Sequence, residues 1–254
     1  FITISQSMLG LFSGIQKNSK KFDIQHGIIH SNKDSYLKEG NVSYNITSNN
    51  VFLLLSGNGY KELLCKNEKG NYYKKHALVI GSSILKNSFL KKKIKNRNVL
   101  VSLQFTNDHT FLENKMIANL LELEIQNNYN FHFFLRQHPR FNSDIDMSKL
   151  LLLPNVSMID GELEDNLLIC SLHLTTYSTT VFETSILGVP SRFIATNVDA
   201  MNIFNTQYKY PYYNYSLSEI YDNYNMISND IQVWSKKFIK PFDQFNFLNV
   251  LKNV

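Results

Sequence analysis

Short apolar runs alternate with amphipathic stretches over residues 98–195 of this chain. The apolar run at 131–135, for example, follows a stretch at 111–126 whose apolar side chains recur at helical spacing. Strands that are separated by helices pair in parallel, because each helix returns the chain to the end of the sheet from which it left. The alternation therefore predicts an α/β fold with a doubly wound parallel sheet. The expected strands are 98–105, 131–135, 156–159, 172–176 and 190–195, and the expected helices are 111–126, 146–152, 164–170 and 178–187.

The first part of the chain gives fewer signals of this kind. One apolar run, at 51–55, is closed by Ser56-Gly57-Asn58-Gly59 and predicts a buried strand followed by a turn. Weaker patterns predict strands at 22–29 and 76–80, helices at 5–12 and 60–66, and a polar loop at 30–50. We therefore expect a first domain at 1–90, a basic linker at 91–97, a Rossmann-like domain at 98–230 and a helical tail at 231–254.

The composition limits the ligands and the compartment. The 254 residues carry a formal charge of +5, and the pI is about 9.0. This mild positive charge suits an anionic substrate or the surface of an anionic membrane, and it does not require nucleic acid. The two cysteines stand far apart without a CxxC partner, so a zinc site is not expected. No apolar stretch reaches the roughly 18 residues of a membrane span. We expect a cytoplasmic location, with peripheral contact at the inner face of the membrane as a second option.

Hydroxyl groups gather at the start of the last helix expected in the regular region. Ser178, Thr179 and Thr180 would bring hydroxyl donors, backbone N–H groups and the positive end of the helix dipole together, which is an anion site. Glu183 lies four residues after Thr179 and shares its helical face, so its carboxylate could accept hydrogen bonds from ribose hydroxyls. Ser178 is the expected N-cap, and Gly188 lies just past the helix end. The alternative is a plain N-cap with a surface glutamate.

A second motif, Arg136-Gln137-His138-Pro139, ends the strand expected at 131–135. Proline disfavours the helical conformation in the preceding residue, so His138 is expected to stay at the tip of the strand. With Arg136 or Arg140 nearby, His138 could neutralise a phosphate and donate a proton. The alternative is a capping histidine beside a solvated arginine.

A third motif, Gln25-His26-Gly27, follows another short apolar segment. Gly27 permits a sharp turn or the close approach of a ligand, and His26 could act as a general base or bind a phosphate. The alternative is an ordinary loop histidine. The other histidines, His109 among them, have no supporting context in the sequence. No DxD pair of carboxylates stands at a strand end, so we expect no dedicated divalent-metal site.

These motifs carry a resemblance to a known family. QHG at 25–27, RQHP at 136–139, YSTTVFET at 177–184 and LGVP at 187–190 resemble, in this order, the GT-B-type bacterial transferases of surface-polysaccharide synthesis. Among these are the capsule polysialyltransferases, the Kdo transferases and the CDP-glycerol glycerophosphotransferases of teichoic acid synthesis. The resemblance implies a C-terminal nucleotide-binding domain at 98–230, preceded by a truncated acceptor-side domain at 1–90.

The resemblance also implies roles for individual residues. His138 would contact the donor phosphates together with Ser178, Thr179 and Thr180, while Glu183 would hold the ribose. His26 would face the interdomain cleft as a base or as a phosphate contact. The remaining binding residues would be Gln25, Gly27, Arg136 and Pro139. No metal and no other cofactor is implied, because basic side chains and a helix end would stabilise the leaving nucleotide.

These expectations combine into one function. The chain would transfer a sugar or a polyol-phosphate from a CMP- or CDP-type donor to a glycan acceptor, a bacterial surface polysaccharide, with His138 at the leaving phosphate and His26 as general base. A sugar-nucleotide 2-epimerase and a non-catalytic nucleotide-binding module are the alternatives. The aromatic stretch Tyr208 to Tyr215 is either a contact surface for a membrane or acceptor glycan, or part of the core.

Overall fold

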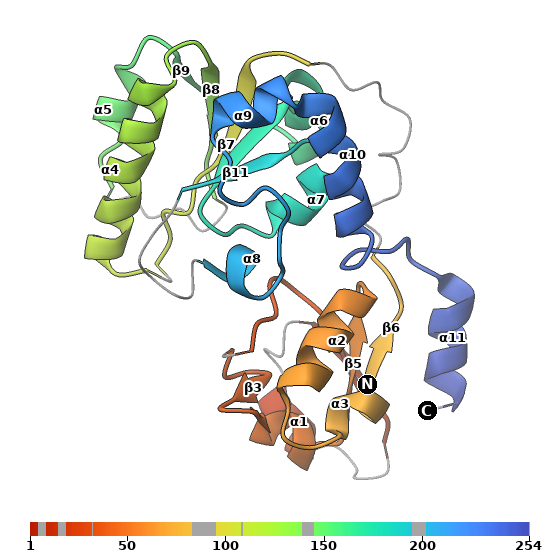
Figure 1. The fold of residues 1–254 in the computed structure, drawn as a ribbon. Coiled ribbons are helices and arrows are strands. Elements are labelled where there is room, and N and C mark those ends of the chain that lie inside the picture. Colours follow the sequence, from red (N-terminus) through yellow and green to blue (C-terminus); the bar gives the residue numbers. More distant parts are fainter. Residues whose placement is uncertain are drawn as a thin grey trace. The chain divides into compact units, whose positions relative to one another are not determined.

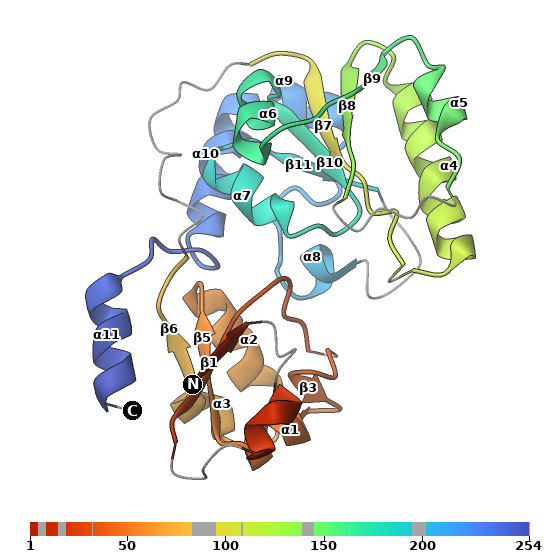
Figure 2. The same cartoon turned by 180° about the vertical axis from the view of Figure 1, so that it is seen from behind.

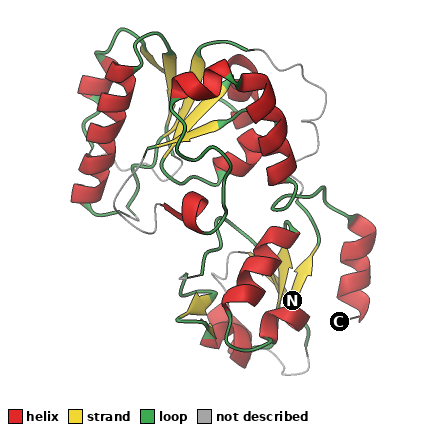
Figure 3. Ribbon diagram, in the orientation of Figure 1, coloured by secondary structure: helices red, strands yellow, loops and turns green. Residues whose placement is uncertain are grey.

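A computed structural model describes residues 1–4, 9–14, 19–31, 33–82, 95–107, 109–138, 145–194 and 202–253. The chain forms two compact units, one from Phe1–Lys86 together with Lys236–Val254 and the other from Asn87–Ser235 (Figure 1). In each unit the strands of the parallel sheet lie at the centre and helices lie outside them (Figure 3). The expected tail at 231–254 is therefore divided between the units at Ser235. Most of the expected linker at 91–97 lies outside the described residues.

The second unit is built on a five-stranded parallel sheet with the order β11-β10-β7-β8-β9. The strands are β7 (Asn98–Ser102), β8 (His132–Arg136), β9 (Val156–Met158), β10 (Leu172–Thr175) and β11 (Ser191–Phe193). The helices are α4 (Phe111–Asn127), α5 (Ser148–Leu151), α6 (Leu163–Ile169), α7 (Thr180–Ile186), α8 (Ile203–Thr206), α9 (Leu217–Asp222) and α10 (Tyr224–Ser235). Every strand and helix that the sequence predicts over 98–195 is present. The α/β fold with a doubly wound parallel sheet is therefore confirmed.

The strand order contains a switch between β7 and β10. From β7 the chain adds β8 and β9 on one side, and it then returns to add β10 and β11 on the other side. Helices α4 and α6 lie on opposite sides of the sheet (Figures 1 and 2). In open α/β sheets, ligands bind outside the carboxyl ends of the strands at such a switch point. The fold therefore points to the residues that follow β7 and β10.

Helix α4 covers one face of this sheet, and its start is fixed by local chemistry. The Thr110 hydroxyl accepts a hydrogen bond from the Glu113 amide at 3.2 Å, and the Glu113 carboxylate accepts one from the Thr110 amide at 2.7 Å. This capping box satisfies two amides that the first helical turn leaves without partners. Apolar residues then line one side of the helix and are buried: Ile117, Leu121 and Ile125.

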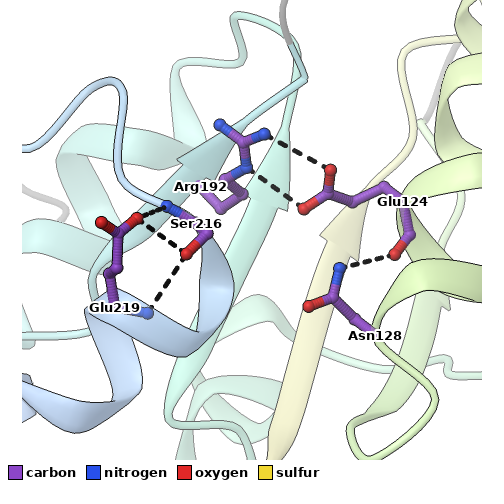
Figure 4. Close-up of polar contacts among 5 residues, drawn as sticks. All are labelled: Glu124, Asn128, Arg192, Ser216 and Glu219. Carbon is purple, nitrogen blue, oxygen red and sulfur yellow. Dashed lines mark hydrogen bonds and ion pairs between the residues drawn. The ribbon is translucent and has the colours of Figure 1, made fainter.

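An ion pair joins α4 to the edge strand β11 (Figure 4). The guanidinium Nε of Arg192 lies 3.1 Å from a carboxylate oxygen of Glu124, and both side chains are largely buried, with exposures of 20% and 17%. On the other side of Arg192, the capping box of Ser216 and Glu219 begins α9 (Figure 4). The pair therefore fixes the outermost strand against a helix that covers the inner ones.

The interior of the same sheet contains a histidine between two serines. The side chain of His173 in β10 is fully buried and lies 2.8 Å from Ser191 Oγ and 2.9 Å from Ser102 Oγ. Burial lowers the pKa of the His173 imidazole to about 3, so the ring is neutral. The three side chains tie β7, β10 and β11 together by hydrogen bonds, of which the one between His173 and Ser191 is fully buried.

The aromatic stretch Tyr208 to Tyr215 belongs mainly to the core. Tyr208, Tyr210 and Tyr213 are buried, and the Tyr210 hydroxyl accepts a hydrogen bond from the Ser191 amide at 2.9 Å. Phe193 of β11 stacks on Tyr213 with 4.7 Å between ring centroids. This segment therefore covers the edge of the sheet at β11, which protects that edge from pairing with another chain.

The first unit is built on a four-stranded parallel sheet with the order β1-β2-β5-β6. The strands are β1 (Ile2–Ile4), β2 (Lys21–Ile24), β5 (Val51–Leu55) and β6 (Ala77–Val79), with a hairpin of β3 (Leu37–Lys38) and β4 (Asn41–Val42). The helices are α1 (Tyr44–Ser48), α2 (Asn58–Asn67), α3 (Tyr72–His76), α11 (Gln244–Asn253) and the 3-10 helix η1 (Leu9–Gly14). Helix α11 lies on one side of the sheet and α2 on the other (Figures 1 and 2). No helix among the described residues is long and apolar enough to cross a membrane.

Sequence patterns describe this unit less well than the second one. The polar loop expected at 30–50 contains the β3–β4 hairpin and α1, and the strand expected at 22–29 ends at Ile24. Strand β1 and helix α3 were not expected. Of the helix expected at 5–12, residues 5–8 lie outside the described ranges, and the rest belongs to η1. The missed elements are two to six residues long, too short for a periodicity to emerge.

The C-terminal segment covers the carboxyl ends of β5 and β6. A side chain at Gly57 would place its Cβ 2.3 Å from the carbonyl carbon of Phe238, and one at Gly81 would lie 2.1 Å from the carbonyl oxygen of Pro241. The Ser56 hydroxyl donates to the Phe238 carbonyl at 2.9 Å. The turn predicted at 56–59 is shorter than expected, because α2 begins at Asn58 with Gly57 as its N-cap. The missing side chain of Gly57 leaves room for the backbone of Phe238.

Candidate functional site

The candidate site lies at the carboxyl ends of the strands in the second unit. Ser102 at the end of β7 is in register with Arg136 at the end of β8. Two residues earlier on each strand, Leu100 and Phe134 belong to the apolar cluster that contains Leu167 of α6. Side chains alternate along a strand, so Ser102 and Arg136 point to the same side, toward the layer that holds α6 and α7.

The guanidinium of Arg136, at the end of β8, has few hydrogen-bond partners among the described residues. Its Nε atom is buried and has no hydrogen-bond partner among the described residues. Its Nη2 atom donates to the Gly161 carbonyl at 3.5 Å, the upper limit for such a bond. Leaving a buried charged donor unsatisfied is costly, and such groups are usually paired. The guanidinium is therefore suited to bind an acceptor that the described residues do not supply.

Glu183 on α7 is the second charged group of the site. Burial raises the pKa of its carboxyl to about 7, the nearby Arg136 counteracts this rise, and Glu164 of α6 adds to it. Within the described ranges, no ion pair and no hydrogen bond is present at the Glu183 carboxyl. The guanidinium of Arg136 and the carboxyl of Glu183 therefore interact electrostatically, although no ion pair between them is present among the described residues.

The turn before α7 carries the predicted hydroxyl groups. The helix begins at Thr180 with Thr179 as its N-cap, so the expectation of Ser178 at that position is wrong by one residue. Ser178 Oγ instead accepts a hydrogen bond from the Thr180 amide at 3.2 Å and lies 2.9 Å from Thr180 Oγ1. Since the two hydroxyls share one hydrogen between them, their second hydrogen can serve a ligand. With seven residues, α7 contributes only a small dipole.

The end of α7 follows the prediction. Gly188 has a φ of +71°, its amide donates to the Ser185 carbonyl at 3.0 Å, and the Val189 amide donates to the Thr184 carbonyl at 2.8 Å. This is a Schellman ending, in which glycine takes the left-handed conformation. It fixes the length of α7 and therefore the position of Glu183 relative to the strand ends.

His138 lies two residues past the end of β8 and is half-buried. The structure thus places it at the same sheet edge as Arg136. Pro139 and Arg140 lie outside the described residues. The proposed roles of His138 and Pro139 in donor binding stay predictions.

A histidine that the sequence did not single out also belongs to this edge. Nε2 of His109, in the loop after β7, lies 2.7 Å from the hydroxyl of Tyr177, in the loop after β10. The two rings are perpendicular, with 5.6 Å between their centroids. Sequence inspection could not find this contact, because the partners are 68 residues apart.

The third motif belongs to the first unit. The side-chain oxygen of Gln25 accepts a hydrogen bond from the amide of Ser56 at 3.0 Å, and the Ser56 hydroxyl oxygen lies 3.0 Å from the same atom. Its side-chain nitrogen donates to the Gly27 carbonyl at 3.3 Å. Gln25 therefore joins the ends of β2 and β5, and its side chain is already engaged within the protein. His26 is exposed, and Gly27 has a φ of +75° with open space where a side chain would be.

The three motifs are thus divided between the units. Arg136, His138 and Glu183 lie in the second unit, while Gln25 and His26 lie in the first. Among the described residues, no group of three histidine, cysteine or acidic side chains is arranged to hold a metal ion.

Comparisons with known proteins support the fold. No family model and no curated protein sequence matches the chain. It is similar to the Staphylococcus aureus MnaA–UDP co-structure, with a TM-score of 0.65 and 12% identity over 99% of this chain and 73% of that one. It is also similar to a variant of the wall teichoic acid polymerase TagF, with a TM-score of 0.56 and 13% identity over 93% of this chain and 68% of that one.

A third similar structure is a UDP-N-acetylglucosamine 2-epimerase from Listeria monocytogenes that carries its function as a provisional assignment. The TM-score is 0.53 and the identity 14%, over 98% of this chain and 72% of that one. These proteins have the GT-B fold, and identities of this size show the fold alone. The expectation of a GT-B-like architecture is therefore confirmed.

Proposed function

We propose that this chain transfers a sugar or polyol-phosphate from a CMP- or CDP-type nucleotide donor to a bacterial surface polysaccharide. The observation that carries the proposal is the pair Arg136 and Glu183. Among the described residues, the buried Nε of Arg136 has no hydrogen-bond partner, and the carboxyl of Glu183 has neither an ion pair nor a hydrogen bond. A nucleotide donor supplies hydrogen-bond acceptors for the guanidinium and hydrogen-bond donors for the carboxylate. Its phosphate oxygens accept hydrogen bonds from a guanidinium, and its ribose hydroxyls donate to a carboxylate.

The remaining polar groups of the edge fit the same ligand. The spare hydroxyl hydrogen of Ser178 and Thr180 would donate to a phosphate oxygen. His138 would donate to the phosphate that leaves. In the reaction, an acceptor hydroxyl oxygen forms the new bond to carbon or phosphorus, and the nucleotide leaves with the electron pair of the broken bond. The acceptor proton passes to a base, for which His26 is our candidate.

A thermal-shift titration with CMP, CDP, UDP, GDP and ADP tests the donor site. We expect one cytidine nucleotide to stabilise the protein, and a ligand at one hundred times its Kd raises the Tm by roughly 5–10 °C for a unit of this size. Arg136→Met should remove the response. The matched control is Arg192→Met, which removes an arginine that is paired with Glu124 on the opposite side of the same sheet. A wild-type protein that responds to no nucleotide would overturn the proposal.

A turnover assay tests the transferase step separately. With donor and acceptor present, we expect His138→Ala to abolish release of the free nucleotide while the protein keeps its wild-type Tm. Unchanged release would contradict the role of His138. Binding in the wild type without release would favour the non-catalytic module.

A sugar-nucleotide 2-epimerase is the second candidate. Two of the similar structures favour it: one holds UDP, and the other carries the 2-epimerase assignment for UDP-N-acetylglucosamine. It predicts stabilisation by UDP rather than by a cytidine nucleotide, and epimerisation of the sugar without an acceptor. The nucleotide series above therefore separates the two candidates at the binding step.

A further inference from the structure

A side-chain contact joins the two loops that flank the switch point of the second sheet. His109 follows β7 and Tyr177 follows β10, and their Nε2 and hydroxyl oxygen lie 2.7 Å apart. Either tautomer of the histidine keeps this hydrogen bond, because the tyrosine hydroxyl both donates and accepts. The contact spans the place where an open α/β sheet binds its ligand.

The loop that carries His109 is held firmly from its own side. The His109 amide donates to the Thr106 carbonyl at 3.2 Å, and the same carbonyl accepts from the side chain of Asn114 at 3.0 Å. Asn114 is fully buried in α4, a helix of 17 residues that begins at the capping box of Thr110 and Glu113. The imidazole therefore projects from a fixed support.

The loop that carries Tyr177 depends more on that support. Tyr177 directly precedes Ser178, whose amide donates to Thr175 Oγ1 at 3.4 Å, a long bond. The hydroxyls of Ser178 and Thr180 bond to each other rather than to a neighbouring element. Through its contact with His109, the Tyr177 side chain links this turn to a rigid element across the switch point.

We propose that His109 is a positioning residue of the donor site, which acts through Tyr177 to hold the 178–180 turn where its hydroxyl group meets a phosphate of the ligand. This inference rests on the proposed function, because it assumes a nucleotide with its phosphates at that turn. A turn that loses the contact keeps its sequence and its helix, but its polar atoms are no longer held in place. Affinity for phosphate-bearing ligands should fall, while affinity for the nucleoside alone should not.

Isothermal titration calorimetry with the full chain tests whether the contact affects binding of phosphate-bearing ligands but not of nucleosides. The ligands are CDP, UDP, cytidine and uridine. We expect His109→Phe and Tyr177→Phe each to weaken binding of the diphosphate about tenfold, and the double variant to be no weaker than either, because both remove the same contact. His109→Gln, which retains a polar nitrogen and oxygen near the same position, should restore most of the affinity.

The control variant is His132→Phe. His132 is also half-buried and also bonded to one hydroxyl, that of Ser157 at 2.9 Å, but it begins β8 and so lies at the opposite end of the sheet. We expect it to bind all four ligands like the wild type. Equal weakening of nucleoside and diphosphate, or a lower Tm in the two edge variants, would reduce the contact to a structural one and overturn the inference.

The two proposals fail in different ways. Wild-type protein that binds the diphosphate while the His109 and Tyr177 variants bind it equally well would overturn the positioning role and leave the proposed function intact. Wild-type protein that binds none of the nucleotides would overturn both.

Discussion

The two parallel sheets of this chain differ at the carboxyl ends of their strands. In the first unit, the carboxyl ends of β5 and β6 are covered by the segment Lys237 to Pro241, which Gly57 and Gly81 admit. In the second unit, the corresponding edge contains the guanidinium of Arg136, whose Nε has no partner among the described residues. The difference shows that topology alone does not create a ligand site. The second edge is the candidate site because a polar group there lacks a partner among the described residues.

At neutral pH, the largest effect should come from adding a side chain at Gly81, where the C-terminal segment occupies the space. Gly81 has a φ of +85° and no room for a side chain beside the Pro241 carbonyl, so Gly81→Ala combines backbone strain with a steric clash. We expect a loss of about 4 kcal/mol in the free energy of unfolding of the first unit. Urea denaturation combined with hydrogen exchange of the β5 and β6 amides measures it.

The matched control is Gly161→Ala in the second unit. Gly161 also has a positive φ, +93°, but open space surrounds it. Only the backbone strain remains, about 1–2 kcal/mol. Equal losses in the free energy of unfolding for the two variants would show that the C-terminal segment does not pack tightly against Gly81. That result would contradict the proposed difference between the two sheet edges.

The next largest effect concerns Glu183, at the carboxyl edge of the second sheet. The raised pKa of Glu183 means that the folded state holds this proton more tightly than the unfolded state, so stability falls as the pH rises from about 4.5 to about 7. Glu183→Gln removes that cost and should stabilise the second unit by about 2–3 kcal/mol at pH 8. Urea denaturation at pH 8 and at pH 5 tests the assignment, since the gain should shrink to below about 1 kcal/mol at pH 5. A gain independent of pH would point to another cause.

Acid should weaken the second unit through His173. The folded state keeps this imidazole neutral, with its pKa lowered to about 3 from 6.5, so protons bind the unfolded state preferentially below pH 6.5. Stability should fall by up to about 1.4 kcal/mol for each pH unit between 6.5 and 3 from this group alone. Comparing wild type with His173→Gln over that range isolates the contribution. If the stability of the two proteins changed with pH in the same way, His173 would not be the cause of the acid sensitivity.

The smallest effect compares one ion pair from each unit. Glu124 pairs with Arg192 at 17% and 20% exposure, whereas Asp34 pairs with Lys38 at 71% and 68% exposure. Glu124→Gln leaves a largely buried guanidinium without its charge partner and should cost about 1–2 kcal/mol. Asp34→Asn should cost less than about 0.5 kcal/mol, because water replaces the partner. Thermal unfolding at low and high salt checks both values, and a larger loss for Asp34→Asn would reverse the ranking.

The fold of the second unit was predictable because its longest helix and its central strands carry clear patterns, and the shorter elements, such as β9 and β11 with three residues each, continue the same alternation. Helix α4 shows the pattern over 17 residues, and the apolar runs of β7 and β8 are continuous. The first unit contains elements such as β1, with three residues, and the β3–β4 hairpin, with two in each strand. At that length, tertiary contacts rather than local pattern decide the conformation.

The candidate site was predictable only where its residues are neighbours in sequence. The motifs identified Arg136, Ser178 and Glu183, since each stands where a strand ends or a helix begins. The engagement of Gln25 with Ser56 and the contact of His109 with Tyr177 join loops far apart along the chain. A single sequence contains no signal for such pairs, because they arise from the strand order of the folded sheet.

The discontinuity of the first unit also sets an order of events during synthesis. Residues 1–86 leave the ribosome first, yet the segment that covers β5 and β6, and the helix that packs on Leu54 and Ile80, come from residues after 235. The second unit, Asn87–Ser235, is continuous and can fold once its own residues have emerged. Of the two units, the one whose synthesis begins first is therefore completed last, and until then part of its apolar sheet face stays uncovered.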